Sequence, residues 1–407
     1  MKDISGGVCA PRGFKAGGIW CGIKASSRKR DLALIYSEKK CTAAAMYTTN
    51  QVKSASILVN QEHIAGGQLH AIIANSGNAN ACTGEAGIFS ARRMAELAAD
   101  EFAISAADVA VASTGVIGVP LPIAAIESSI GALANSLQGD SSGHSAAIEA
   151  IMTTDTRRKE FSVEVEIGGV PVRIGGMAKG SGMMHPNMAT MLCFITTDAA
   201  ISRELLEMSL RRAVSRSFNR VTIDGDTSTN DMAIIMANGA SGAPFISNIN
   251  GEYEIFSAAL EASCIRMARA MARDGEGATR LIAVTVSGAD DEESAAILAK
   301  SVASSSLVKA ACFGSDANWG RVLCAMGYSG AEFAPGQTSL RFKSSAGEIA
   351  VCSHGEMVPF SEEAAKAILG EEEIEILVEV GNKDCSATVW GCDLTYDYVK
   401  INGDYRS

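Results

Sequence analysis

Residues 179–192 read Lys179-Gly-Ser-Gly-Met-Met-His-Pro-Asn-Met-Ala-Thr-Met-Leu192, a glycine-containing loop that runs into an apolar, β-prone segment. The bond between Ala189 and Thr190 lies where the two meet. The Thr190 hydroxyl can attack the carbonyl before it, and cleavage would free an α-amino group with a pKa of about 7.7–8.0, suited to a general base. One residue would then carry both the nucleophile and its base. The pattern alone favours a plainer interpretation, in which Thr190 opens a β-strand as β-branched residues often do.

The composition is that of a soluble globular protein. The 407 residues are enough for two domains or one large one, and 47% hydrophobic with 20% charged residues are ordinary values. No apolar run approaches the ~20 residues that a membrane helix needs. The net charge of -11 argues against general nucleic-acid binding, which requires clustered Lys and Arg. We therefore expect neither a nucleic acid nor a membrane as partner.

The cysteines and histidines favour a reduced, metal-free protein. The eleven cysteines include no C-x-x-C pair, and the start of the chain lacks the charged-then-apolar pattern of a secretory signal. We expect free thiols and a cytoplasmic location. No pair among the five histidines has metal-ligand spacing, so we expect no metal site.

Strand-like and helix-like segments follow one another in blocks along the chain. Periodicity predicts a strand, a turn and a helix around 68–75, 75–80 and 84–102, and a hairpin from 161–167 and 170–174. It also predicts strands over 31–48, 108–113, 190–197, 338–352 and 372–399, and helices over 122–137, 203–217 (capped by Ser202), 252–273, beyond about 280, and near 362–369. This blocking favours an α+β fold, layered from helices and mixed sheets, over a doubly wound parallel sheet.

The loop Ser113-Thr-Gly-Val-Ile-Gly118 is a candidate for stabilising an oxyanion, because its small residues leave backbone N–H groups accessible and Thr114 adds a hydroxyl. On residue types alone, a strand-to-helix turn that uses glycine for positive φ is the more frequent explanation.

Two acidic loops are further candidates. Asp224–Asp231 lacks the pattern of an EF-hand and fits a polar turn between strands. In Asp274–Arg280, Glu276 stands between two glycines, which suits either a helix end or a carboxylate that reaches into a cleft. The chain has no nucleotide-binding or serine-hydrolase motif.

Together these segments resemble the ornithine acetyltransferase family, also called bifunctional glutamate N-acetyltransferases. The matching pieces keep one order along nearly the whole chain, and the 179–192 run is the most specific of them. They are Gly22–Lys24, Tyr47–Asn50, Asn75–Asn80, Thr114–Gly118, Met152–Thr156, Lys179–Leu192, Asp224–Asp231, Asp274–Arg280, Asn318–Arg321 and Ile401–Ser407. Ala317 and Ala310 depart from the family pattern, at positions outside the proposed catalytic residues.

The resemblance implies a self-processing enzyme of the N-terminal-nucleophile type. Cleavage at Ala189-Thr190 gives fragments 1–189 and 190–407, with a further subdivision expected near 280. Thr190 accepts acetyl from N2-acetyl-L-ornithine and passes it to L-glutamate in arginine biosynthesis. The implied oxyanion pair is Thr114 and Gly115. The implied substrate contacts are Thr153 (with Thr154 as an alternative), Lys179, Thr190, Glu276, Asn402 and Ser407.

The resemblance also implies no cofactor and a heterotetramer of two α and two β fragments. It leaves open whether acetyl-CoA serves as a second donor. The competing hypotheses are a self-processing aminopeptidase or amidohydrolase with water as acceptor, and a non-catalytic binding protein with an intact chain.

Overall fold

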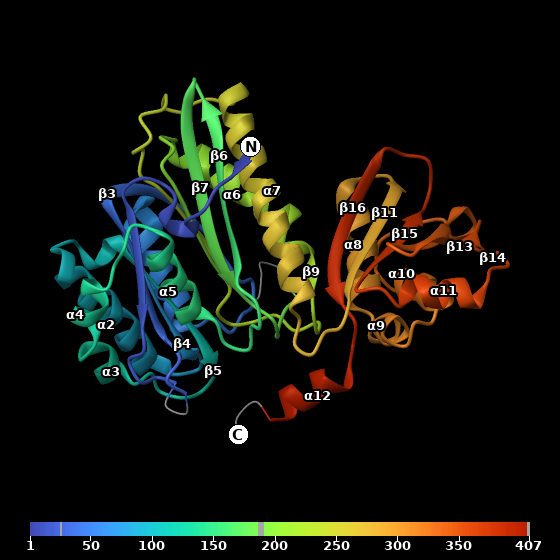
Figure 1. Ribbon diagram of the computed structural model, residues 1–407, viewed down its shortest axis with the longest axis horizontal. Coiled ribbons are helices and arrows are strands. Elements are labelled where there is room, and N and C mark those ends of the chain that lie inside the picture. Colours follow the sequence, from blue (N-terminus) through green and yellow to red (C-terminus); the bar gives the residue numbers. More distant parts are fainter. Residues whose placement is uncertain (25–26, 186–190, 405–407) are drawn as a thin grey trace. The chain divides into compact units, whose positions relative to one another are not determined.

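The computed structural model describes residues 1–24, 27–185 and 191–404 (Figure 1). The chain forms two compact units, of which the first comprises residues 1–180, 187–219 and 227–267. The second comprises residues 181–186, 220–226 and 268–407. The division at the predicted cleavage point, into 1–189 and 190–407, stays a prediction.

The first unit is built on a mixed sheet. Its strands in the described residues run in the order β1-β6-β7-β8-β10-β3-β4-β5, with β2 paired to β3. The β4–β5 and β8–β10 pairs are parallel and the other pairs are antiparallel. The strands are β1 Lys2–Asp3, β2 Phe14–Ile19, β3 Leu32–Tyr47, β4 Gln68–Asn78, β5 Val109–Val116, β6 Lys159–Ile167, β7 Val170–Lys179, β8 Leu192–Thr197 and β10 Met232–Ala237.

Helices bury both faces of this sheet. Ile72 of β4 lies in the same apolar cluster as Ile148 of α5 (Ser141–Ile151), whereas the next residue, Ile73, packs in a separate cluster with Met94 of α2 (Gly84–Phe102). Successive strand residues point to opposite faces, so both faces of the β4 region are core. The other helices of this unit are α1 Ala55–His63, α3 Ile123–Glu127, α4 Ile130–Asn135 and α6 Arg203–Arg216, with most of α7 Gly251–Arg273.

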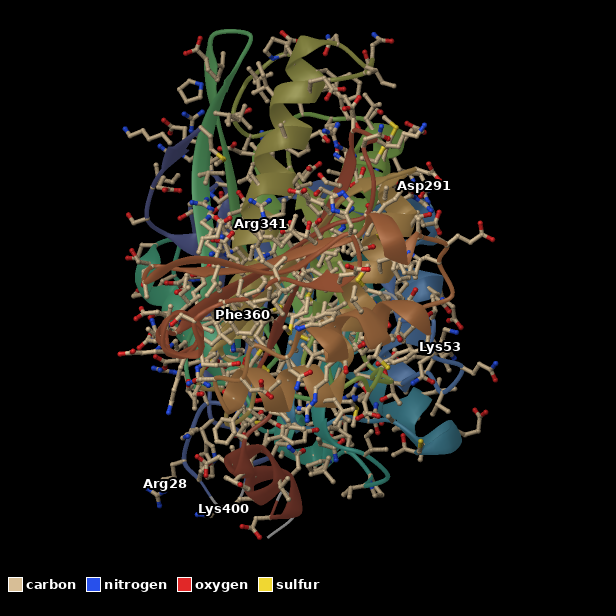
Figure 2. All side chains as sticks on the ribbon, turned by 90° about the vertical axis from the view of Figure 1, so that its right-hand side faces the viewer. Arg28, Lys53, Asp291, Arg341, Phe360 and Lys400 are labelled. Carbon is tan, nitrogen blue, oxygen red and sulfur yellow. The ribbon has the colours of Figure 1, made fainter. Side chains whose placement is uncertain are left out.

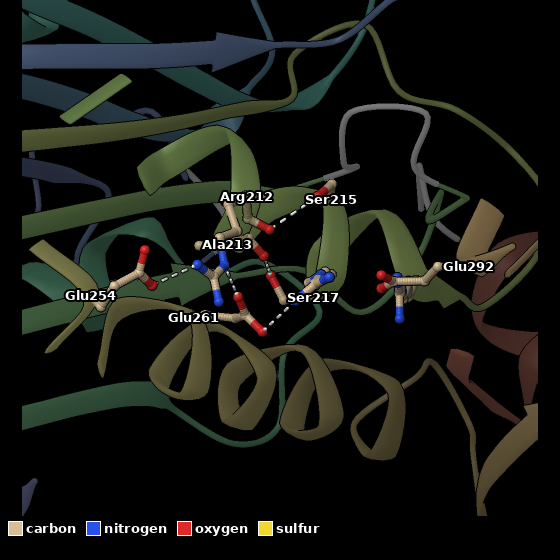
Figure 3. A network of polar contacts seen from close by, with 9 residues as sticks. Arg212, Ala213, Ser215, Ser217, Glu254, Glu261 and Glu292 are labelled. Atoms are coloured by element: carbon tan, nitrogen blue, oxygen red, sulfur yellow. Dashed lines mark hydrogen bonds and ion pairs between the residues drawn. The ribbon is translucent and has the colours of Figure 1, made fainter. Parts of the chain in front are cut away.

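An arginine ties α6 to α7 (Figure 3). Arg212 Nε donates to Glu261 Oε2 at 2.7 Å, and its Nη1 donates to Glu254 Oε2 at 3.1 Å. The fork of a guanidinium suits such a pair of carboxylates. At the start of α6, the Ser202 hydroxyl accepts from the Leu205 N–H at 3.4 Å, as the sequence predicted.

The second unit is a sheet with one helical layer. Its strands run β14-β13-β12-β15-β11-β16-β9 in the described residues. Ile282, Val284 and Val286 of β11 join the apolar cluster with helix residues such as Leu298. The strands are β9 Val221–Thr222, β11 Leu281–Ala289, β12 Ser339–Ser344, β13 Gly347–Ser353, β14 Glu356–Met357, β15 Glu373–Glu379 and β16 Cys385–Cys392, and the helices are α8 Glu292–Ser304, α9 Ser306–Phe313, α10 Trp319–Gly327, α11 Glu362–Leu369 and α12 Tyr396–Gly403.

Ion pairs cross neighbouring strands on the polar face of the second sheet. Arg341 of β12, labelled in Figure 2, pairs with Glu348 of β13 at 2.9 Å and Glu379 of β15 at 2.5 Å. Because all three side chains are 40–51% exposed, these pairs stabilise the fold by little, about 0–1 kcal/mol each.

The predicted α+β class is confirmed, and so are the helices at 84–102, 252–273 and 362–369 and the 161–174 hairpin. Three local predictions are wrong, and one is incomplete. The single helix over 122–137 is two short helices, separated at Ser128 and Ser129, whose residue type competes for backbone hydrogen bonds. The turn predicted over 75–80 is strand as far as Asn78.

The other two differences lie in the second unit. A helix was predicted beyond about residue 280, and α8 is that helix, but the prediction missed strand β11, which comes before it. The strand predicted to reach 399 ends at Cys392, and α12 follows. Thr395 caps α12 by accepting from the Tyr398 N–H at 3.2 Å, which overrides the β-propensity of the aromatic residues there.

Candidate active site

The predicted oxyanion residues lie at the end of β5. Thr114 is half-buried, and Gly115 has a φ of +132° at a point where the β4–β5 register shifts. A Cβ at Gly115 would lie 2.3 Å from the carbonyl carbon of Gly77, closer than any real side chain could sit. Only glycine therefore fits, and the segment is a close backbone approach within the sheet rather than a plain turn after it.

Lys179 and Thr114, predicted separately, are in contact. Lys179 ends β7, and its Nζ donates to Thr114 Oγ1 at 3.3 Å. An ammonium has no acceptor, so the threonine oxygen must be the acceptor and its own hydroxyl proton stays available for another partner. This arrangement lets Thr114 donate to an oxyanion beside a fixed positive charge.

Thr153 follows α5 and is half-buried, with its N–H donating to Asp155 Oδ2 at 3.0 Å. Nearby, Lys24 Nζ donates to the Met152 carbonyl at 2.7 Å. Burial lowers the pKa of Lys24 to about 8; Asp31 opposes the shift and Lys179 adds to it. Lys24 and Asp155 lie inside the family motifs Gly22–Lys24 and Met152–Thr156, but no functional role was predicted for either residue.

In the second unit, residues 181–184 of the glycine-containing loop are held by hydrogen bonds. The Met183 and Met184 N–H groups donate to Asp224 carboxylate oxygens at 2.6 and 2.8 Å. The Glu276 N–H donates to the Ser181 carbonyl at 2.8 Å. Asp224, predicted to lie in a polar turn, thus anchors the loop before the predicted cleavage point.

Glu276 and Asn402, both predicted as substrate contacts, also meet. Glu276 lies past the end of α7 and is 8% exposed, and Asn402 Nδ2 on α12 donates to its Oε2 at 2.8 Å. A Cβ at Gly182 would lie 2.3 Å from the same Oε2. The glycine thus lets the loop pass directly over the Glu276 carboxylate.

Ala189, Thr190 and Ser407 lie outside the described residues. The predicted roles of Thr190 and Ser407, and the cleavage at Ala189-Thr190, therefore stay predictions, as do the roles of the residues placed above.

Other features of the described residues bear on the expected partners. All eleven cysteines are free, and no cluster of His, Cys, Asp and Glu in the described parts could hold a metal ion. A cavity of about 320 Å³ lies between the end of β3 and α6, lined by Tyr47 and Arg203 among others and by none of the predicted site residues within the described ranges. Within the same parts no single helix could cross a membrane, and only α8 and α9 taken together, bent by 59°, meet the length and composition requirement.

Comparison with known proteins decides the family. The sequence model of the ArgJ family matches residues 15–407. The chain belongs to the ArgJ family. The arginine biosynthesis bifunctional protein ArgJ of Symbiobacterium thermophilum is 51% identical over 408 residues, which cover 100% of both chains. ArgJ 1 of Clostridium acetobutylicum is 51% identical over 394 residues, 97% of this chain and 96% of that protein.

A solved ArgJ structure agrees with this assignment. The crystal structure of ArgJ from Bacillus halodurans matches with a TM-score of 0.50 and 42% identity, over 52% of this chain and 98% of that chain. The resemblance drawn from the sequence is confirmed, and with it the expectation of an acyltransferase of arginine biosynthesis that acts on small molecules.

Proposed function

We propose that this ArgJ family member transfers acetyl from N2-acetyl-L-ornithine to L-glutamate through an acetyl-Thr190 intermediate. The observation that carries the proposal is the family match over residues 15–407, with relatives about half identical along their full length. The contact between Lys179 Nζ and Thr114 Oγ1 supports it, because it joins a predicted substrate contact to the predicted oxyanion residue.

The reaction needs two similar steps. Thr190 Oγ attacks the acetyl carbonyl of the donor, the amide C–N bond breaks, and ornithine leaves with a proton from the Thr190 ammonium. The α-amine of glutamate then attacks the ester and restores the free hydroxyl. Negative charge builds on the carbonyl oxygen in each step, where the Thr114 hydroxyl, backed by Lys179, donates a hydrogen bond.

Self-cleavage at Ala189-Thr190 is part of the proposal. The alignment with the Bacillus halodurans structure covers nearly all of that crystallised chain but only 52% of this one, so the crystallised chain is little more than half as long. That length is close to the one predicted for the 190–407 fragment and supports a processed subunit in the family.

The side chains of the two substrates carry opposite charges. Ornithine ends in an ammonium and glutamate in a carboxylate, so one site must tolerate both. The family resemblance implies both Glu276 and Lys179 as substrate contacts, and the two carry opposite charges; Asn402 holds the Glu276 carboxylate by its hydrogen bond. We propose that Glu276 favours the ornithine side chain and Lys179 the glutamate side chain.

The remaining parts of the proposal come from the family resemblance. They are a reaction without a cofactor, a heterotetramer of two α and two β fragments, and a cytoplasmic location. We further propose acetyl-CoA as a second donor, a use that the word bifunctional in the names of the relatives is compatible with.

Purified protein supplied with N-acetylornithine and glutamate tests the proposal. We expect equal amounts of ornithine and N-acetylglutamate, with acetate far below both. Acetate equal to ornithine would instead indicate a hydrolase, and no product would refute the activity. Replacing N-acetylornithine by acetyl-CoA in the same assay tests the second donor, because N-acetylglutamate then forms only if acetyl-CoA is used.

A further inference from the structure

A single buried carboxylate joins three segments of the first unit. Asp155 Oδ1 accepts from Lys159 Nζ at 2.6 Å and from the Gly180 N–H at 2.8 Å, while Oδ2 accepts from the Thr153 N–H at 3.0 Å. Both the Asp155 and the Lys159 side chains are 0% exposed. The carboxylate thus holds the loop after α5, the start of β6 and the end of β7 at one point.

Asp155 is held in its ionised form. Burial acts to raise the pKa of Asp155, but the charges of Lys179 and Lys159 and the hydrogen bonds outweigh burial and hold it at about 2. The ammonium of Lys159 is equally buried, and a buried charge without a partner is strongly destabilising. At neutral pH the carboxylate is therefore a fixed negative charge in the core of the unit.

The partners of the Asp155 carboxylate lie next to, or are themselves, predicted functional residues. Gly180 is the first residue after β7, has a φ of +154°, and starts the loop that leads to the predicted cleavage point. Thr153 is a predicted substrate contact. Lys179, whose charge Asp155 balances, donates to Thr114 Oγ1 at the predicted oxyanion position.

We propose that Asp155 is a positioning residue for both self-cleavage and acetyl transfer, because its two oxygens fix the start of the cleavage loop and the backbone of Thr153. Its link to Gly180 orients the peptide that leaves β7, and its charge keeps Lys179 directed towards Thr114. Loss of the carboxylate slows both reactions, since a misplacement of about 1 Å can cost about 10²-fold in rate. The inference rests on the proposed function.

A purely structural role predicts something different. If Asp155 served only to neutralise Lys159, replacing both partners by uncharged residues would restore stability and activity together, as is often found for buried pairs. The positioning role predicts that stability returns in the Asp155→Asn/Lys159→Met double variant while both reactions stay slow. An asparagine presents one oxygen where the carboxylate presents two. It therefore cannot replace the two charge-assisted hydrogen bonds that Asp155 accepts from the Gly180 and Thr153 N–H groups.

The experiment compares Asp155→Asn, the double variant and Asp198→Asn with the parent protein. Asp198 is the matched control: it is 0% exposed in the same unit and accepts from the Arg12 and Arg173 N–H groups at 3.2 and 2.7 Å, but it has no hydrogen bond to any predicted site residue that the structure describes. Each protein is followed for fragment formation on a denaturing gel, for kcat and KM of acetyl transfer, and for thermal unfolding.

We expect ~10- to 100-fold slower cleavage and lower kcat in both Asp155 variants, and parent-like rates in Asp198→Asn. Recovery of both rates in the double variant, or equal losses in Asp198→Asn, would overturn the positioning role. The activity of the parent protein distinguishes failure of the proposed function from failure of the Asp155 role. A parent that neither cleaves nor transfers acetyl refutes the proposed function itself, whereas an active parent with an equally active Asp155→Asn variant refutes this inference alone.

Discussion

Replacing Gly115 by alanine gives the sharpest quantitative test of the oxyanion segment. The new Cβ would lie 2.3 Å from the carbonyl carbon of Gly77, 2.6 Å from the Asn78 nitrogen and 2.7 Å from the Gly77 oxygen. All three are backbone atoms of the neighbouring strand β4, so no side chain can turn aside to make room. Strand β5 must instead move away from β4, and the Gly115 N–H moves with it.

The loss of folding stability expected for Gly115→Ala has two separate contributions. A non-glycine residue at a φ of +132° costs about 1–3 kcal/mol, and overpacking costs about another 1–3 kcal/mol. Gly118 provides the control, because it has a φ of +80° but nothing within 4 Å of a built Cβ. Gly118→Ala therefore carries the backbone cost alone, about 1–2 kcal/mol. We expect Gly115→Ala to be less stable than Gly118→Ala by about 2 kcal/mol.

Urea unfolding of both variants measures this difference, and the cleavage and transfer assays measure its consequence. Loss of one oxyanion donor typically costs about 10²–10³ in rate, which we expect for Gly115→Ala. Gly118→Ala should keep nearly the parent's activity. Equal stabilities of the two variants would refute the packing argument. Full activity in Gly115→Ala would refute its place at the oxyanion.

Three further predictions concern Glu276 and Asp155. Glu276→Gln should slow the half-reaction with N-acetylornithine more than the half-reaction with glutamate, when the rate of each is measured separately. Equal effects on the two rates would contradict the role of Glu276 in charge selection. Gly182→Ala, whose Cβ would meet Glu276 Oε2 at 2.3 Å, should raise KM for N-acetylornithine with little change in the unfolding midpoint, because a flexible side chain yields; an unchanged KM would count against it. The pKa of Asp155 is lowered from 3.8 to about 2, so its charge stabilises the fold above pH ~4 and this is lost as the pH falls towards 2. Over that pH range the free energy of unfolding should fall by about 2 kcal/mol more in the parent than in Asp155→Asn. Parallel plots of unfolding free energy against pH for the two proteins would contradict the lowered pKa.

Much of the fold could be read from periodicity because the long elements carry strong patterns. Helix α2 has buried residues such as Ala91, Met94 and Ala98 at helical spacing, and its predicted bounds agree with the structure. The errors came where local propensity loses to context. The Tyr396–Val399 segment is rich in β-formers, yet Thr395 caps it as a helix.

The chemistry of the site was less accessible from the sequence. Thr114 and Lys179 are 65 residues apart, and only the folded chain shows that they are in contact. The joining role of Asp155 depends on the Gly180 N–H, a backbone group that no residue pattern reports. The resemblance to a family supplied the candidate residues, and the structure supplied the contacts that connect Thr114 with Lys179 and Glu276 with Asn402.

Self-cleavage before Thr190 is tested by the mass of the purified protein and of a Thr190→Ala variant under denaturing conditions. We predict two fragments for the parent, residues 1–189 and 190–407, the second beginning with a free Thr190 amine, and one full-length chain for the variant. A parent that remains a single chain while it transfers acetyl, or a Thr190→Ala variant that still cleaves at this bond, would contradict the account.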